Sequence, residues 1–387
     1  MIKVLTYNEI NKQQWQALID RSPYATWFQT PEAYEFYASN PEEMTPFAIG
    51  VEEKECKVES LKFKGEENSE AETTASTPYT LHPTPALKGV IVGYITRERN
   101  SIKQLLTCRA IIIGGPLLAD DATDEEVAAL LKAVAECRAY SVECKGNENS
   151  KAVTSASTPY TLRPTPIYIE TRNFHDYSKW RNIFEANGFA YQPHLNFHVD
   201  TSSVEMVDKN LGKSRKRDIR TTIRDGVTPV YQPTLNQIKE YYQILLNLYT
   251  TKVKTPLFSW NFFEQLHRTE HARFILTEYQ GRIIGGTVCV ELPNRALYEW
   301  FACGKDGLYD HIYPSCYATY LGIKYAAESG CQIFDMMGAG KPDEAYGVRD
   351  FKAKFGGELV EHGRFLCVRK PLLYKLGKLG VKILKKR

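Results

Sequence analysis

A run of cations between Lys213 and Arg224 is the first feature of the sequence that could do chemistry. It holds six basic residues and a single acid, Asp218. Arg217, Arg220 and Arg224 recur at spacings of three and four, so a helix would carry three guanidinium groups on one face. Because guanidinium groups pair well with phosphate, the run predicts a phosphate clamp. An exposed helix flank is the alternative.

A lysine near the C-terminal end could stabilise negative charge. Lys352 lies in the segment Val348–Phe355, which is predicted to form a short helix. A fixed cation can stabilise the oxyanion that forms when an amine attacks an ester. From the residues alone, a solvated lysine on that helix is the simpler interpretation.

Candidates for acid–base chemistry lie nearby. Deprotonating an ammonium group requires a side chain of suitable pKa close to the amine. Asp335, at the end of a predicted strand, and Asp350 could serve as the base, and Tyr313 could serve as an acid toward a leaving group. Each of the three could equally be structural.

The cysteines and histidines do not suggest a metal site. The nine cysteines are scattered and never form a C-x-x-C pair, so we expect buried thiols rather than disulfides or zinc ligands. Three histidines alternate with apolar residues in predicted strands and are expected to be packing or surface residues: His194, His198 and His362. No metal and no cofactor are therefore expected.

Length and composition predict a globular protein of two domains. The chain has 387 residues, of which 43% are hydrophobic and 25% charged, and a net charge of +3. That charge is too small to indicate general nucleic-acid binding, although the local basic clusters indicate anionic partners. No stretch reaches the roughly 20 apolar residues that span a bilayer, and no signal peptide is apparent. We expect a cytoplasmic protein.

One internal repeat interrupts the predicted elements. Residues 64–85 and 145–166 align without gaps and share the run ASTPYTL. Both copies are rich in Thr, Ser and Pro and poor in apolar periodicity, so they cannot bury enough surface to order themselves. We predict two disordered loop insertions, at about 54–88 and 143–166. A ligand-binding arm is the alternative.

The remaining elements occur in the same order twice. After a helix at Lys12–Ile19, the first half is predicted to contain strands Pro46–Glu52, Gly89–Ile95 and Ala110–Pro116, helix Glu125–Cys137, strand Ile167–Glu170, helix Ser178–Asn187 and strand His194–Val199. After helices at Leu235–Leu248 and Trp260–His267, the second half is predicted to contain strands Arg273–Tyr279, Ile283–Leu292 and Ala296–Ala302, helix Pro314–Glu328, strand Gln332–Met336, helix Val348–Phe355 and strand Leu359–Val368.

This order is that of the GNAT fold. We therefore predict an α/β (α+β) protein with tandem GNAT-like domains at 1–200 and 201–387, each a mixed, largely antiparallel sheet flanked by helices. An acyl-coenzyme A enzyme of this fold holds pyrophosphate at a glycine-rich turn before a helix. The equivalent stretch, 303–311, has different glycine spacing, and Asp306 would repel phosphate. This favours an acyl donor held in another way.

Five segments resemble the FemABX family of aminoacyltransferases. They are WFQTPEAYEFY (27–37), IIIGGPLL (111–118), KSRKRDIRTTIRDGV (213–227), YPSCYATYLGIKYA (313–326) and FDMMGAGKPDEAYGVRDFKAKFGGELVEHGRF (334–365). The resemblance implies twin GNAT-like domains and transfer of an amino acid from aminoacyl-tRNA. The acceptor would be an amine on the stem peptide of a nucleotide- or lipid-linked peptidoglycan precursor.

The resemblance also implies roles for single residues. Lys352 matches the family's functional Phe-Lys pair and would contact the tRNA end or the developing negative charge, while Phe351 would form a wall of the groove. Arg217 or Arg220 would hold the precursor's pyrophosphate. The other assigned residues are Asp335 as a catalytic group, and Lys213, Tyr313, Tyr346 and Arg349 as substrate-binding groups.

One departure keeps other functions open. This chain has Phe36-Tyr37 where some family members have a lysine, which leaves the precursor's phosphate contacts and the acceptor undefined. An N-acyltransferase that moves an acyl group from acyl-coenzyme A to an amino sugar or surface-glycan precursor is the enzymatic alternative. A non-catalytic twin-domain binding protein is the second alternative.

The C-terminal tail is predicted to be an amphipathic helix. Residues 369–387 hold eight basic residues and no acid. Leu372, Leu376, Leu379 and Ile383 share one stripe. The stripe could dock on anionic lipid at the inner face of the membrane, near a lipid-linked acceptor, or pack on the last strand.

Overall fold

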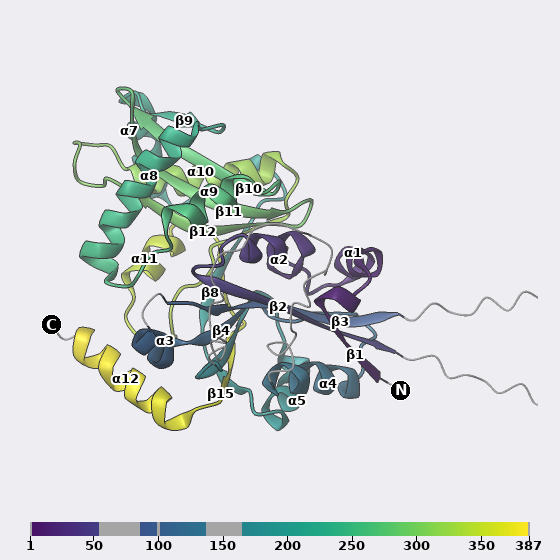
Figure 1. The fold of residues 1–387 in the computed structure, drawn as a ribbon. Helices are drawn as coiled ribbons and strands as arrows, with labels where there is room; N and C mark the ends of the chain where they lie inside the picture. The colour runs from purple at the N-terminus through teal and green to yellow at the C-terminus, as the bar shows by residue number, and fades with distance from the viewer. Residues whose placement is uncertain (1, 54–85, 99–100, 137–164, 386–387) are drawn as a thin grey trace, which may run out of the picture.

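Figure 1 shows the computed structural model, which describes residues 2–53, 86–98, 101–136 and 165–385. Two sheets lie one above the other in this view, and helices pack on both. The predicted fold class is confirmed. The two predicted insertions fall almost entirely outside the described residues, since β3 already begins at Leu87. Within the described ranges, no helix has the length and apolar character needed to cross a membrane.

The first sheet is mixed, with β4 and β6 as its parallel pair. Its strands lie in the order β1 (Ile2–Thr6), β2 (Met44–Glu53), β3 (Leu87–Thr96), β4 (Arg109–Gly114), β6 (Tyr168–Asn173), β15 (Arg364–Val368) and β7 (Ala190–Gln192), and β5 (Leu117–Leu118) pairs with β3. The helices of this half are α1 (Lys12–Arg21), α2 (Pro31–Ala38), α3 (Ser101–Thr107), α4 (Asp124–Ala135) and α5 (Arg181–Ala186).

The second sheet is also mixed. Its strands lie in the order β14 (Glu358–Glu361), β8 (Leu195–Asp200), β13 (Ile333–Asp335), β12 (Ala296–Gly304), β11 (Arg282–Leu292), β10 (Ala272–Tyr279) and β9 (Thr228–Val230). The remaining helices are α6 (Val204–Asn210), α7 (Lys213–Arg224), α8 (Leu235–Leu248), α9 (Trp260–His267), α10 (Pro314–Glu328), α11 (Gly347–Ala353) and α12 (Pro371–Lys385). β12 and β13 are parallel, with only three residue pairs in register.

Local sequence signals explain several of these elements. At the start of α4, Thr123 Oγ1 accepts a hydrogen bond from Glu126 N, and the Glu126 carboxylate accepts one from Thr123 N. This reciprocal cap satisfies two main-chain amides that the helix leaves free. The predicted buried thiols are confirmed for the described cysteines: Cys108, Cys289, Cys303, Cys316, Cys331 and Cys367.

The two sheets exchange strands. β8 belongs to the second sheet, where it lies between β13 and β14, although it was expected to close the first half. The predicted single strand Leu359–Val368 is wrong: β14 stays in the second sheet and β15 returns to the first. Gly363 makes this turn at φ +64°, and a Cβ there would lie 2.3 Å from the Tyr191 ring. The boundary at 200/201 stays an expectation, while strands from each side of it enter the other sheet.

Aromatic rings join the two halves. Phe28 lies edge-on to Tyr298 and Trp300, with ring centroids 5.7 and 5.0 Å apart. Phe36 packs on Phe262 with centroids 5.0 Å apart. Buried aromatic pairs of this kind contribute large apolar area with defined geometry. Phe36 is therefore part of the contact between the two halves.

Candidate functional site

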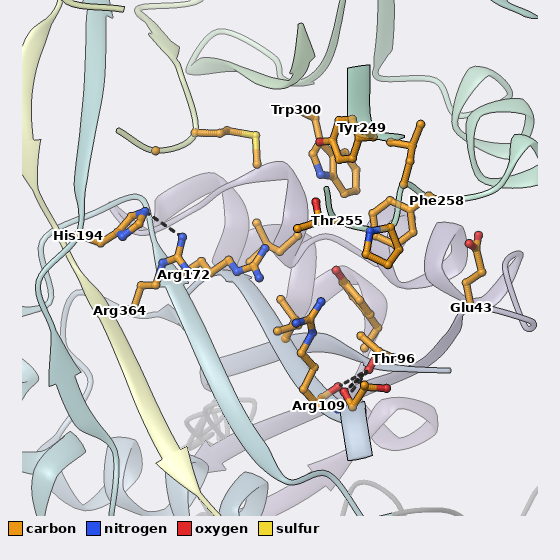
Figure 2. A pocket seen from close by; sticks show the side chains of 18 of the residues that line it. Glu43, Thr96, Arg109, Arg172, His194, Tyr249, Thr255, Phe258, Trp300 and Arg364 are labelled. Carbon is orange, nitrogen blue, oxygen red and sulfur yellow. Dashed lines mark hydrogen bonds between the residues drawn. The ribbon is translucent and has the colours of Figure 1, made fainter. Parts of the chain in front are cut away.

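A cavity of about 1110 Å³ lies between the two halves of the molecule. The first sheet contributes residues of β3, β4, β6 and β15 to its lining. The second sheet contributes β8 and β12, and the loop after β13 and the segment 254–259 complete the wall. A space of this size exceeds what a small metabolite needs. Figure 2 shows the side chains that point into it.

Three arginines from three neighbouring strands of the first sheet line one side of the cavity. Arg109 comes from β4, Arg172 from β6 and Arg364 from β15 (Figure 2). Among the described residues, the Arg109 guanidinium has no acidic partner. Arg109 therefore presents its guanidinium group to the space, whereas Arg172 and Arg364 line the cavity and also bind Glu170.

The charges of this cluster are not balanced within the fold. Arg172 and Arg364 stand directly opposite each other across β6 and β15, an arrangement of like charges that destabilises a sheet. Glu170 pairs with both, 3.0 Å from Arg172 Nε and 2.7 Å from Arg364 Nη1. Burial alone would raise the pKa of Glu170, but the two arginines lower it to about 2. One carboxylate beside three guanidinium groups leaves two positive charges in excess.

His194 fixes the orientation of one arginine. Its Nε2 lies 2.9 Å from Arg364 Nη2. Burial and the charge of Arg364 lower the pKa of His194 to about 4. At neutral pH the imidazole is therefore uncharged, so it can accept a hydrogen bond from Arg364 and adds no charge of its own.

Carboxylates also line the cavity. Glu43 lies across the space from Arg364 in Figure 2, and Glu42 and Glu98 line the same cavity. The Glu43 carboxylate accepts hydrogen bonds from Ser259 N and Ser259 Oγ, each at 2.9 Å. These bonds tie the start of β2 to the segment 254–259 of the second half. Carboxylates thus line the cavity across from Arg364, together with two further cations, Arg97 and Lys254.

A β-bulge brings Trp300 into the cavity. In the pairing of β11 with β12, Val288 faces Phe301 and Cys289 faces Glu299, so Trp300 has no partner in the register. Bulges redirect a side chain and locally increase twist. The Trp300 ring stacks on Phe301 with centroids 5.8 Å apart and forms part of the cavity wall.

Lys352 lies behind the cavity wall rather than in it. Its Nζ donates hydrogen bonds to Met336 O and, at 2.8 Å, to Gly338 O. Met337 and Gly338 line the cavity. Burial lowers the pKa of Lys352, although Glu299 and Asp335 act in the opposite direction. The ammonium group thus holds the loop that forms the wall.

Asp335 organises the same loop. Its carboxylate accepts hydrogen bonds from Asn196 Nδ2 at 2.8 Å and Met337 N at 2.6 Å, and lies 3.0 Å from His198 Nε2. Burial would raise the pKa of Asp335, but His198 and Asn196 lower it. Asn196 lines the cavity and its Oδ1 accepts from Gly338 N at 2.7 Å. Asp335 therefore orients a cavity residue without lining the cavity.

Phe351 packs on a buried arginine that the sequence analysis did not single out. The Arg215 guanidinium lies 4.4 Å from the centroid of the Phe351 ring and 5.1 Å from that of Phe355. It also lies 3.5 Å from Asp218. Phe351 thus joins α11 to α7 and is not one of the residues that line the cavity.

The predicted phosphate clamp lies on the outside of α7. The run from Lys213 to Arg224 forms one helix, as predicted. Lys213, Arg217 and Arg220 are exposed, and Arg217 pairs with Asp218 at 3.0 Å. These cations are not among the residues that line the cavity.

The other three predicted binding residues also lie outside the cavity. Tyr313 precedes α10 and is half-buried. Tyr346 precedes α11 and is exposed. Arg349 donates hydrogen bonds to Ala339 O at 2.9 Å and Pro342 O at 3.4 Å, so it closes the loop after β13.

The sequence did contain a signal for the arginine cluster. Glu170 and Arg172 are two residues apart in the sequence, so in a strand both lie on one face, opposite Ile169 and Thr171. A charged residue on one face of a strand indicates that this face meets water or a ligand. Nothing in the sequence indicates that Arg364 pairs with Arg172 across 192 residues, so the cluster itself was missed.

Comparisons with known proteins agree with the fold. Residues 261–382 match the model of the FemAB family. The structure is similar to a crystal structure of FemX, with 13% sequence identity, a TM-score of 0.63, and coverage of 97% of this chain and 99% of that one. The family model thus covers less than half of the chain, and at 13% identity the similarity to FemX is one of fold.

Other solved structures are also similar to this chain. A conserved protein of unknown function from Bacteroides thetaiotaomicron is 8% identical, with a TM-score of 0.52 and coverage of 95% of this chain and 100% of that one. A tandem GNAT protein from the clavulanic acid biosynthesis pathway is 9% identical, with a TM-score of 0.49 and coverage of 95% and 98%. No curated protein sequence matches this chain.

Proposed function

We propose that this FemABX-like protein is an aminoacyltransferase that moves an amino acid from aminoacyl-tRNA to an amine of a peptidoglycan precursor. The acceptor binds in the cavity between the two halves. The observation that carries this assignment is the cluster of Arg109, Arg172 and Arg364, which points into the cavity with too little negative charge around it.

The cluster favours an acceptor that carries phosphate. Arg172 and Arg364 face each other, and like charges that face each other cost stability. A bound anion would offset this cost. Phosphate oxygens would accept hydrogen bonds from several guanidinium groups at once, and charge-assisted bonds of this kind are the strong ones. The carboxylates at the far end, including Glu43, offer a place for an ammonium group of the same ligand.

The reaction itself needs few protein groups. The acceptor amine attacks the ester carbonyl carbon, a C–N bond forms, the C–O bond to the tRNA ribose breaks, and the amine's proton passes to that ribose oxygen.

In this proposal Lys352 and Asp335 are positioning residues, because they bind the main chain of the wall that carries Met337 and Gly338. A wall held within a fraction of an ångström keeps the reactants in attacking geometry.

The exposed basic face of α7 is assigned to the donor. Lys213, Arg217 and Arg220 project outward from a single helix. Cations on an open surface suit a long polyanion such as the tRNA backbone, whose phosphates attract them over a distance. The family resemblance implied that Arg217 or Arg220 holds the precursor's pyrophosphate; in this proposal both bind tRNA instead.

One contact supports a donor other than an acyl-coenzyme A. The main-chain amide of Ser315, at the start of α10, donates to the Asp306 carboxylate at 3.1 Å. Gly304 is also crowded there, since a Cβ on it would lie 2.6 Å from Ser315 N. A carboxylate at the helix N-terminus holds the position that a pyrophosphate would need.

The test is transfer of a labelled amino acid from a mixture of charged tRNAs to purified nucleotide-linked and lipid-linked precursors, with an acetyl-coenzyme A reaction alongside. The proposal predicts label in the precursor from tRNA alone. The variant Arg109→Gln should raise KM for the precursor, and Arg268→Gln, another exposed arginine, is the matched control. Label that arrives only from acetyl-coenzyme A would overturn the proposal, and label from neither donor would favour a binding protein.

A further inference from the structure

Two helices beside the cavity expose leucine side chains to solvent. On α12, Leu372 is 78% exposed, Leu376 61% and Leu379 56%. On α3, Leu105 is 54% exposed and Leu106 47%. Single exposed leucines are ordinary on a protein surface, but three on α12 together with two on the neighbouring helix α3 indicate an interaction surface.

The leucines of α12 point outward because another face of the helix is already packed. Tyr374 lies edge-on to Tyr168 of β6, with ring centroids 5.4 Å apart, and Leu373 is half-buried. Leu372, Leu376 and Leu379 are spaced by four and three residues, so they form a second stripe turned away from this contact. Figure 1 shows α12 beside α3 at the edge of the molecule.

Basic residues border the leucine stripe. Lys375 and Lys378 are exposed on α12, and Lys378 Nζ lies 4.7 Å from the ring centroid of Tyr374. The sequence from 369 to the C-terminus contains no acid that could neutralise them. A narrow apolar stripe with cations along its side complements a surface that has anionic head groups above an apolar layer.

This surface also adjoins the cavity. Thr107 is the last residue of α3 and lines the cavity together with Arg109 and Thr96. Main-chain and side-chain hydrogen bonds connect these residues, since Arg109 N donates to Thr96 Oγ1 at 3.1 Å. A partner on α3 and α12 would therefore lie next to the cavity's arginine-rich side.

We infer that α3 and α12 dock the protein on an anionic lipid bilayer. The leucines enter the boundary between head groups and acyl chains, and Lys375 and Lys378 pair with lipid phosphates. Docking in this way places the cavity beside the membrane surface. The inference rests on the exposed leucines and lysines and does not depend on the proposed reaction.

The experiment is co-sedimentation of the full chain with vesicles of phosphatidylcholine plus phosphatidylglycerol and with vesicles of phosphatidylcholine alone. The wild type should bind the anionic vesicles and lose binding at high salt. Leu372→Ser/Leu376→Ser should lower the partition coefficient roughly tenfold or more, and Lys375→Gln/Lys378→Gln should act in the same direction. Leu308→Ser changes an equally exposed leucine, 63% accessible, outside this surface and should bind as the wild type does.

Two results would overturn the inference. One is equal binding of wild type and Leu372→Ser/Leu376→Ser to anionic vesicles. The other is a wild type that ignores vesicles but self-associates in sedimentation velocity, with the double variant monomeric, since a second copy would then cover the stripe. Because the substituted leucines are exposed, thermal unfolding of the variants should match the wild type, which separates a docking defect from a folding defect.

Discussion

Replacing Glu170 by Gln tests whether the arginine cluster is built to hold an anion. Glu170 is the carboxylate shared by Arg172 and Arg364, at 3.0 and 2.7 Å. Its side chain is nearly buried, so its charge is poorly screened. The Glu170→Gln variant keeps the shape of the side chain but leaves both guanidinium groups without a counter-charge.

The stability cost follows from the pKa of Glu170. The folded protein lowers this pKa from 4.5 to about 2, and each pKa unit corresponds to 1.36 kcal/mol, so the ionised carboxylate contributes about 3 kcal/mol. Because the pKa is depressed on folding, the contribution is complete above pH 4.5 and disappears as pH falls toward 2. The difference in unfolding free energy between wild type and Glu170→Gln should be about 3 kcal/mol at pH 7 and should shrink steadily below pH 4.5.

Anions should have the opposite effect on the variant. Without the carboxylate, an anion in the cavity no longer meets a negative charge at about 6–8 Å, a repulsion worth roughly 2–3 kcal/mol at an effective dielectric constant of about 20. Pyrophosphate should therefore bind Glu170→Gln at least roughly tenfold more tightly than wild type and should raise its Tm by more. Thermal unfolding across pyrophosphate concentrations measures both effects. If pyrophosphate stabilises neither protein, or stabilises only the wild type, the reasoning is refuted.

Three further predictions concern other parts of the site. Lys352→Ala removes the two hydrogen bonds that the ammonium donates to the loop, so the free energy of unfolding in urea should fall by about 2–4 kcal/mol. The variant should also lower kcat more than it raises KM for the precursor, and an unchanged kcat would contradict the positioning role. Arg217→Gln/Arg220→Gln should raise KM for aminoacyl-tRNA several-fold, leave KM for the precursor unchanged and reduce the salt dependence of the rate, and steady-state kinetics at two salt concentrations checks this. Burial lowers the pKa of His198, but the hydrogen bond to Asp335 outweighs it and raises this pKa above 6.5. The loss of unfolding free energy in His198→Asn should therefore be largest below pH 6.5 and should fade as the pH rises through the pKa of the folded protein. Unfolding at pH 5.5 and 8.5 measures it, and an equal loss at both would contradict the assignment.

Local patterns in the sequence were enough to predict most elements. The helix predicted near Glu125–Cys137 is confirmed by α4, which Thr123 caps through residues only three apart. The predicted cationic helix is α7, where Arg217 and Arg220 are exposed on one side. Periodicity and capping are local properties, so a single sequence contains them.

The exchange of strands between the sheets is not a local property. β15 follows β14 after a break of only two residues, and Gly363 marks the turn within the polar stretch from Glu361 to Arg364. Which sheet a strand joins depends on partners such as β6, nearly two hundred residues earlier. The arginine cluster depends on that pairing, because only β15 brings Arg364 to Arg172.

The predicted site residues illustrate the same distinction. Lys352 and Asp335 come together at one loop, as neighbours in a short segment would. Their hydrogen bonds to main-chain carbonyl and amide groups, however, place both side chains behind the cavity wall. The direction of these side chains depends on the conformation of the loop, which the sequence does not specify. Their catalytic roles stay predictions, as does the part of Tyr313, Tyr346 and Arg349 in substrate binding.

Equilibrium binding of the nucleotide-linked precursor measures the central claim most directly. Isothermal titration of wild type, Arg109→Gln and the exposed control Arg268→Gln should show a Kd raised roughly tenfold by Arg109→Gln alone, since a charge-assisted hydrogen bond contributes about 1.5–3 kcal/mol. Arg109 is exposed and has no acidic partner in the described part of the chain, so its loss should leave folding intact. Equal Kd values for the three proteins would contradict a phosphate-bearing acceptor in the cavity between the sheets.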